Sequence, residues 1–186
     1  MFACPFFLTF VPITVVDPVF HFTVCYPELP SKYNQVIGSF IEEQVRKYCS
    51  SYTEKQQLWI RYTPYVSSLS LSFLFQKSID YGGAHPMHSL YTFSITDSGL
   101  FSVLDFSLGE LSLISQIVQK GLKEELQASS MYVEWMFSEG TAPTYENYRN
   151  VLLLEDGYLF FFEPYQVAPY ASGIQSYFVP FDFYDL

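Results

Sequence analysis

Apolar and polar side chains alternate along several segments of this chain. The pattern is clearest over residues 68–75, where leucine and phenylalanine occupy positions 69, 71, 73 and 75 and serine occupies positions 68, 70 and 72. A period of two residues is typical of a β-strand with two different faces. Shorter runs of this kind predict further strands over 19–26, 58–62, 91–95, 100–103, 151–154, 158–162 and 174–179.

Two segments instead repeat their apolar residues every three or four positions, which predicts helices over 31–50 and 107–126. Ser31 is placed to cap the first helix, and Ser107 with Glu110 forms a capping box for the second. Residues 128–147 give no clear periodicity. Because hairpin turns join most strands, we predict an α+β fold: an antiparallel sheet of hairpin-connected strands packed with two main helices, without βαβ winding.

The length of 186 residues suits one domain, and we predict that residues 19–186 form it. Residues 1–18 form an apolar N-terminal segment with no charge in its first sixteen positions. They lack the features of a complete signal peptide, and the apolar run is shorter than the roughly 20 residues of a membrane-spanning helix. We interpret them as an extended strand packed on the domain or as the remnant of a leader. No transmembrane helix is expected in this chain.

Charge is distributed unevenly. The net charge is −10, and residues 124–186 contain one basic residue, Arg149, against ten acidic ones. This acidity excludes a protein that tracks nucleic-acid phosphates. It favours a basic partner, although a solvated acidic face that only maintains solubility would give the same count.

The sequence contains no recognised catalytic residues and no cofactor-binding motif. Phosphate-binding glycine motifs and the common nucleophile motifs are absent from it. His85 and His88 are weak candidates for metal ligands, because no third ligand is placed by the pattern and the nearby Gly82, Gly83 and Pro86 disfavour a helix. A loop whose histidines form local hydrogen bonds, or a pH-sensitive contact, explains the same residues.

Two loops are distinctive in composition. The first carries two glycines between strands, and the second combines tyrosines, a rigid proline and a flexible glycine. Both could simply turn the chain at the ends of the sheet, or they could form an aromatic surface for a ligand. The candidate binding residues are Tyr81, Gly82, Gly83, Ala84, His85 and Pro86 in the first loop, and Tyr165, Ala168, Pro169, Tyr170, Ala171 and Gly173 in the second.

These two loops, taken together, resemble the RsiV/PdaC-like extracytoplasmic domain. This domain of unknown function stands at the C-terminus of anti-sigma factors and is attached to peptidoglycan deacetylases. The similarity extends over roughly residues 20–185 and also includes Val24–Pro27, Leu69–Phe75, Tyr91–Gly99, Leu104–Phe106 and Asn150–Phe162. No catalytic residue of the family is carried over to this sequence.

The resemblance implies a non-enzymatic bacterial binding or sensing domain on the outer side of the cytoplasmic membrane. Its partner would be a basic protein such as lysozyme, or a cell-wall component such as a peptidoglycan fragment. Two alternatives remain: a wall-active hydrolase or deacetylase with an unrecognised histidine and carboxylate site, and a purely structural accessory module. Whether the chain is an enzyme therefore stays open at this point.

Overall fold

The computed structural model describes residues 10–16, 21–27, 31–50 and 56–183. The chain divides into two compact units. The first comprises residues 1–63 and 75–89, and the second comprises residues 64–74 and 90–186. Strands β3 (Gln57–Val66), β4 (Leu71–Asp80) and β5 (Met87–Thr96) each contribute one part to both units. That residues 19–186 form a single domain stays a prediction.

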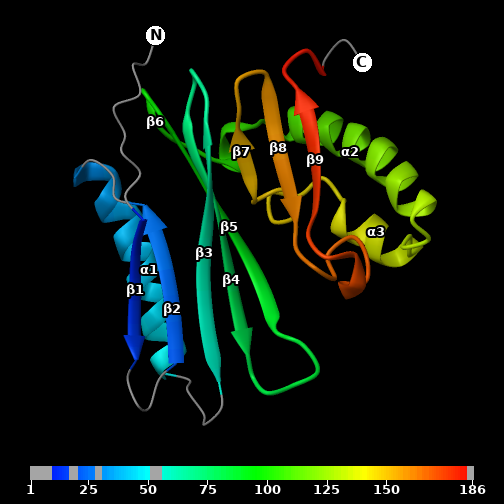
Figure 1. Ribbon diagram of the computed structural model, residues 1–186. Helices are drawn as coiled ribbons and strands as arrows, with labels where there is room; N and C mark the ends of the chain where they lie inside the picture. The colour runs from blue at the N-terminus through cyan, green and yellow to red at the C-terminus, as the bar shows by residue number, and fades with distance from the viewer. Residues whose placement is uncertain (1–9, 17–20, 28–30, 51–55, 184–186) are drawn as a thin grey trace. The chain divides into compact units, whose positions relative to one another are not determined.

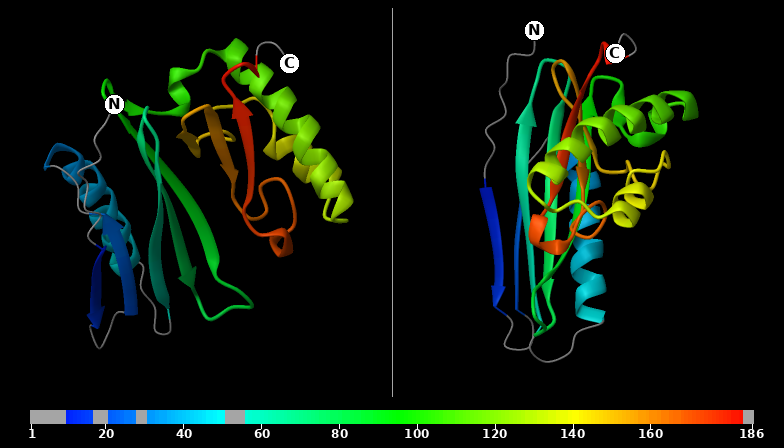
Figure 2. Two further views of the ribbon diagram at one scale, coloured as in Figure 1. Left: turned by 45° about the horizontal axis from the view of Figure 1, so that its top comes forward. Right: turned by 90° about the vertical axis from the view of Figure 1, so that its right-hand side faces the viewer.

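The first unit begins with β1 (Phe10–Val16), which pairs in an antiparallel manner with β2 (His21–Pro27). Strand β1 lies within the predicted N-terminal apolar segment, of which residues 1–9, 17 and 18 are outside the described ranges. Helix α1 (Ser31–Ser50) follows and lies along one face of these strands (Figures 1 and 2). It leads to β3, which pairs with β2 in parallel over Gln57–Ile60. The prediction of no βαβ winding is wrong at this one crossover.

Helix α1 buries most of its predicted apolar stripe. Ile37, Ile41 and Tyr48 are buried, and the ring of Phe40 meets that of Phe75 edge-on at 5.6 Å. The Tyr48 hydroxyl donates a hydrogen bond of 2.9 Å to the Gln56 carbonyl. These buried residues anchor the helix, and Val36 on the same helix is 38% exposed.

The second unit places two helices against a small antiparallel sheet. Its further elements are β6 (Gly99–Phe101), α2 (Leu108–Ala128), α3 (Glu134–Gly140), β7 (Val151–Leu153), β8 (Gly157–Phe162) and β9 (Gln175–Pro180). The strand order is β7-β8-β9, and α2 runs beside β9 (Figures 1 and 2). The capping box predicted for the second helix is confirmed, because Ser107 accepts from the Glu110 backbone N–H and Glu110 accepts from that of Ser107. The α+β class is confirmed, with three α-helices among the described residues instead of two.

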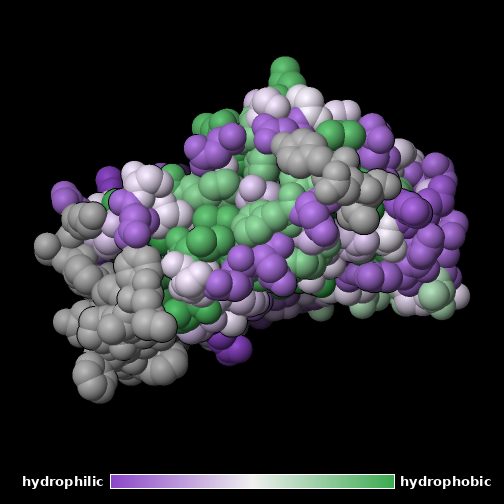
Figure 3. Space-filling view, turned by 90° about the horizontal axis from the view of Figure 1, so that it is seen from above, coloured by the Kyte–Doolittle hydropathy of each residue, from purple (hydrophilic) through white to green (hydrophobic). Residues whose placement is uncertain are grey.

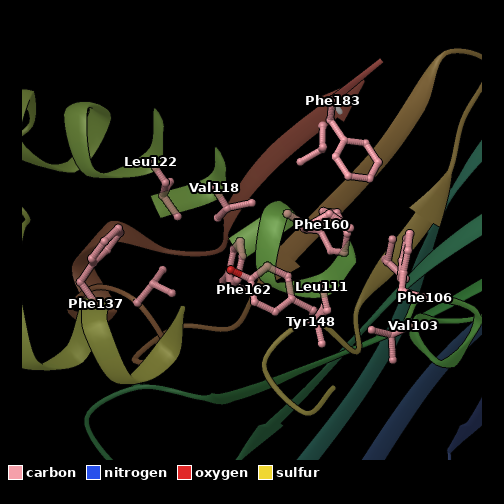
Figure 4. Close-up of a cluster of buried hydrophobic side chains, with 14 of the residues drawn as sticks. Val103, Phe106, Leu111, Val118, Leu122, Phe137, Tyr148, Phe160, Phe162 and Phe183 are labelled. Carbon is pink, nitrogen blue, oxygen red and sulfur yellow. The ribbon is translucent and has the colours of Figure 1, made fainter. Parts of the chain in front are cut away.

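The core of the second unit is rich in aromatic residues (Figure 4). Leu111, Val118 and Leu122 of α2 face Phe160 and Phe162 of β8 across it. Burying an aliphatic or aromatic side chain of this size contributes roughly 1.5–3 kcal/mol. This cluster is therefore the main source of stability in the unit. Within the described ranges, no helix is both long and apolar enough to cross a membrane.

Tyr148 lies at the centre of this cluster and gives a testable pH dependence. Its hydroxyl donates to the Thr141 carbonyl at 3.0 Å, and burial raises the pKa of Tyr148 to about 12. An unfolded tyrosine ionises near pH 10. Between pH 10 and about 12 the unfolded state therefore releases a proton that the folded state keeps, so the folded state is most stable below pH 10 and loses stability as the pH rises to about 12. We expect the free energy of unfolding to fall by about 2 kcal/mol over that range. Urea titrations at several pH values measure it, and Tyr148→Phe should flatten the dependence. An unchanged slope in Tyr148→Phe would contradict the assignment.

Buried hydroxyl groups support the outer edge of β7. Ser70 and Ser72 of the alternating segment donate to the Leu153 carbonyl at 2.5 and 3.1 Å. The Leu153 N–H donates to Ser94 at 3.0 Å, and the Val151 N–H donates to Thr92 at 3.1 Å. Strand β7 pairs with β8 along its other edge, so side chains replace a neighbouring strand here. The serine face of residues 68–75 is thus largely buried, and Leu69 on the apolar face is 43% exposed.

Candidate functional site

The loop between β8 and β9, residues 163–174, is held by a series of tight turns. The Gln166 N–H donates to the Glu163 carbonyl at 2.9 Å, and the Tyr165 N–H donates to the Ala168 carbonyl at 3.1 Å. A short 3₁₀ turn follows at Tyr170–Ser172, directly after Pro169. Proline fixes φ at the value that such a turn entry requires. Pro169 and Gly173, which predicted a loop here, therefore stand at the two ends of this turn.

Two residues of this loop have positive φ angles. Gly173 adopts φ 67° and ψ −156°, a combination open almost only to glycine. Tyr165 has φ 72°, which costs a bulky L-residue about 1 kcal/mol or more. Tyr165 is 48% exposed, and the centroid of its ring lies 5.5 Å from that of Tyr170. The loop thus presents a tyrosine pair from a strained backbone position.

The loop is fixed to α3 by its middle residues. Val167 and Ala168 are buried in the core cluster. The Gln166 amide nitrogen donates to the carbonyls of Asn147 and Gly140, and its amide oxygen accepts from the Glu163 N–H. These bonds resist movement of the loop and offset the strain at Tyr165. Among the predicted binding residues of this loop, Ala168 is buried, whereas Tyr165 and Ala171 are exposed.

Glu163 and Arg149 complete the base of the loop. One Glu163 carboxylate oxygen accepts from the Leu90 N–H at 2.8 Å and lies 3.2 Å from an Arg149 guanidinium nitrogen. Arg149 also pairs with Glu146. Because Arg149 is the one basic residue in positions 124–186, both neighbours reduce the positive charge that this part of the chain shows to a partner.

The glycine–histidine loop belongs to the first unit. Gly82 has φ 76°, and its N–H donates to the Asp80 carboxylate at 2.7 Å, which closes a turn around Tyr81. Tyr81, Gly82, Gly83 and Ala84 are exposed. His85 and Pro86 are half-buried. The predicted residues of this loop thus form a solvent-facing turn. Because the two predicted loops lie in different units, a shared surface stays a prediction.

The two histidines form separate local contacts. His88 Nδ1 lies 2.8 Å from the Ser78 hydroxyl, and His85 Nδ1 lies 3.3 Å from the Pro86 carbonyl. Burial, together with the charge of His85, lowers the pKa of His88. Among the described residues, no group of three His, Cys, Asp or Glu side chains is arranged to hold a metal ion.

The two units differ sharply in charge. The first contains six basic and six acidic residues and is neutral, whereas the second contains three basic and thirteen acidic residues. The net charge of the second unit, −10, therefore equals that of the whole chain. Sequence order alone placed the acidity in residues 124–186, but Asp97, Asp105 and Glu110 belong to the same unit. The sequence did indicate that the acidic region begins before residue 124, since positions 78–119 contain no lysine or arginine.

Comparison with known proteins finds similarity to a family of unknown function. The profile of the family described as "Protein of unknown function (DUF3298)" matches residues 106–182. This match includes the Tyr165–Gly173 loop and excludes the glycine–histidine loop. No curated protein matches the sequence.

Two solved structures of DUF3298 proteins share the fold. One, from Pseudomonas aeruginosa PAO1, has a TM-score of 0.70 and 11% identity, over 97% of this chain and 93% of that chain. The other, from Bacteroides fragilis NCTC 9343, has a TM-score of 0.62 and 16% identity over the same shares of the two chains. At these identities the similarity establishes the fold.

Proposed function

We propose that this chain is a non-enzymatic binding protein of the bacterial cell envelope that recognises a basic protein through its second unit. The observation that carries the proposal is the separation of charge between a neutral unit and a unit of net charge −10. Lysozyme is the first partner to test, because it is the partner that the resemblance to the RsiV/PdaC-like domain implies. The extracytoplasmic location is part of the same proposal and rests on that resemblance.

The acidic side chains of the second unit are available to a partner. Those that are exposed are Asp97, Asp105, Glu124, Glu125, Glu134, Glu139, Glu146, Glu155, Asp156 and Asp182. Two of its three cations are engaged within the unit, since Arg149 pairs with Glu163 and the Lys123 ammonium lies 5.0 Å from the centre of the Tyr132 ring. A field of one sign accelerates association with an oppositely charged protein by roughly 10- to 1,000-fold at low salt.

Association kinetics with lysozyme test this proposal. Glu125→Lys/Glu139→Lys raises the charge of the second unit by four at two exposed positions. We expect association to slow by about tenfold at low salt and its salt dependence to become weaker. Glu163 is left unchanged because its carboxylate holds the loop base.

The matched control makes the same change of charge in the neutral unit. Glu42→Lys/Glu43→Lys alters two exposed positions of α1, and the exposed Glu43–Lys47 pair that it removes contributes little to stability. We expect less than about a threefold change in the association rate for this variant. Equal rates for the wild type and both variants would contradict recognition through the charge of the second unit.

A further inference from the structure

Three hairpin turns of the second unit meet at one of its ends. They are Ser67–Ser70 between β3 and β4, Asp97–Gly99 between β5 and β6, and Glu155–Gly157 between β7 and β8. The backbone N–H and the hydroxyl of Ser68 donate to the Glu155 carboxylate at 2.6 and 2.5 Å, which joins the first turn to the third. These bonds lower the pKa of Glu155.

A groove of about 470 Å³, here called the turn groove, opens between these turns. It is lined by Ser68, Leu69, Thr96, Asp97, Ser98, Leu100, Phe101, Asp105 and Leu153. Leu69 and Leu100 are 43% and 48% exposed. In the space-filling view onto this side of the chain, hydrophobic residues gather beside hydrophilic ones (Figure 3).

The base of the turn groove is held in place by hydrogen bonds to Leu153 and by ring packing around Phe101. Phe101 stacks on Tyr158 with a centroid separation of 5.7 Å and an interplanar angle of 15°. Phe106 meets Phe101 edge-on at 5.6 Å. The Leu153 carbonyl is bonded by two buried serines. A preformed base lowers the ordering cost of binding.

The charge of the turn groove is of one sign. Asp97 and Asp105 belong to its lining, and the Glu155 carboxylate is bonded to Ser68 of that lining. Residues 64–74, 90–119 and 150–183, which supply its turns, contain no lysine, arginine or histidine. Beyond the groove, Leu104 and Leu108 on either side of Asp105 are 72% and 68% exposed. Apolar and acidic side chains are thus interspersed.

We infer that the turn groove binds a cationic amphipathic segment of the partner protein. The inference rests on the proposed function and names its contact surface: apolar partner side chains lie between Leu69 and Leu100, and lysine or arginine side chains face Asp97 and Asp105. A second copy of this chain is disfavoured as the occupant, because it would bring another unit of net charge −10 to an acidic surface. The Tyr165 loop is not required for this contact.

Two synthetic peptides of equal charge test the inference. The first alternates lysine with leucine over twelve residues, and in the second serine replaces every leucine. Both are added to the isotopically labelled full chain at physiological salt, and backbone amide shifts are followed by NMR. We expect saturable shifts at residues 68–69 and 96–101 with the lysine–leucine peptide, and at least tenfold weaker binding of the lysine–serine peptide.

Variants of the groove then separate it from the general acidity. Leu100→Ser and Asp97→Lys change exposed positions, and each should lower the affinity for the lysine–leucine peptide by about tenfold. Glu139→Lys makes the same change of charge as Asp97→Lys but lies outside the groove, so it should lower the affinity for the lysine–leucine peptide less than threefold. Preserved amide dispersion shows that each variant is folded.

The contrary outcomes are distinct. Equal binding of both peptides, or shifts confined to other surfaces, would overturn the turn groove as the contact surface. Failure of lysozyme to associate with the wild type, with the peptide still mapped to the groove, would overturn the proposed partner and leave the groove supported. If Glu125→Lys/Glu139→Lys loses association with lysozyme but the peptide does not bind at the groove, the proposed partner is supported and the turn groove is overturned as its contact surface.

Discussion

Gly140→Ala is expected to destabilise the second unit by about 3 kcal/mol. Gly140 ends α3, and a β-carbon placed on it would lie 1.9 Å from the Gln166 carbonyl oxygen and 2.6 Å from the carbon of that carbonyl. The obstructing atoms belong to the backbone of a loop that is bonded to α3, so no side-chain rotation relieves the overlap. The loop would have to leave α3 and give up the hydrogen bonds of Gln166.

Urea unfolding measures this effect. The fluorescence of Trp135, in a Trp59→Phe background, reports on α3 and hence on the second unit. The matched control is Gly109→Ala in the first turn of α2, where the nearest atom to the added carbon is 3.9 Å away. Alanine favours a helix more than glycine does, so the free energy of unfolding of this control should rise by up to about 1 kcal/mol. Similar midpoints for the two variants would show that the loop does not lie against α3.

Ser94→Ala is expected to lower the free energy of unfolding by about 2 kcal/mol. Ser94 is fully buried and receives hydrogen bonds from the Leu153 N–H and from the Ser72 hydroxyl, at 3.0 and 2.8 Å. Alanine leaves the Leu153 N–H without its acceptor, whereas the Ser72 hydroxyl can still donate to the Leu153 carbonyl at 3.1 Å. The outer edge of β7 would then be joined to β5 only by the bond from the Val151 N–H to Thr92, because Leu153 has no strand partner on that side among the described residues.

Hydrogen exchange makes this test specific. The amide of Leu153 should lose protection in Ser94→Ala by more than global destabilisation explains. Ser98→Ala, on the exposed turn of the same hairpin, should change stability by less than about 0.5 kcal/mol. If Leu153 remains as protected as its neighbours in Ser94→Ala, the hydroxyl support of β7 is refuted.

The features predicted correctly from the sequence depend on neighbours along the chain. The helix at Leu108–Ala128 follows from the spacing of its apolar residues and from a capping box whose members are three positions apart. The hairpins at Asp97–Gly99 and Glu155–Gly157 follow from turn residues between apolar runs. Such signals lie within a few residues and need no knowledge of the tertiary structure.

The missed features depend on distant neighbours. Strand β3 was predicted to stop before Pro64, yet it extends to Val66. Strand β2 pairs with β3 only over Gln57–Ile60, so Pro64 lies beyond that pairing and its missing N–H breaks no bond to β2. Helix α3, seven residues long, lies in the segment that showed no clear periodicity.

In the candidate site, too, the local features could be predicted from the sequence and the long-range contacts could not. Proline and glycine predicted that residues 165–173 form a loop, and the structure confirms it. The bonds of Gln166 to Gly140 and Asn147 could not be predicted, because they join positions 26 and 19 residues apart, respectively. The turn groove was missed for the same reason: its lining comes from four segments that only the fold brings together.

Calorimetric titration of the full chain with lysozyme at physiological salt tests recognition of a basic partner most directly. An equally basic, unrelated protein serves as the control. Saturable 1:1 binding of lysozyme with no comparable binding of the control is the expected result. Equal heats with both proteins would mean that the acidity of the second unit attracts any cation, and no heat with either would contradict recognition of a basic protein.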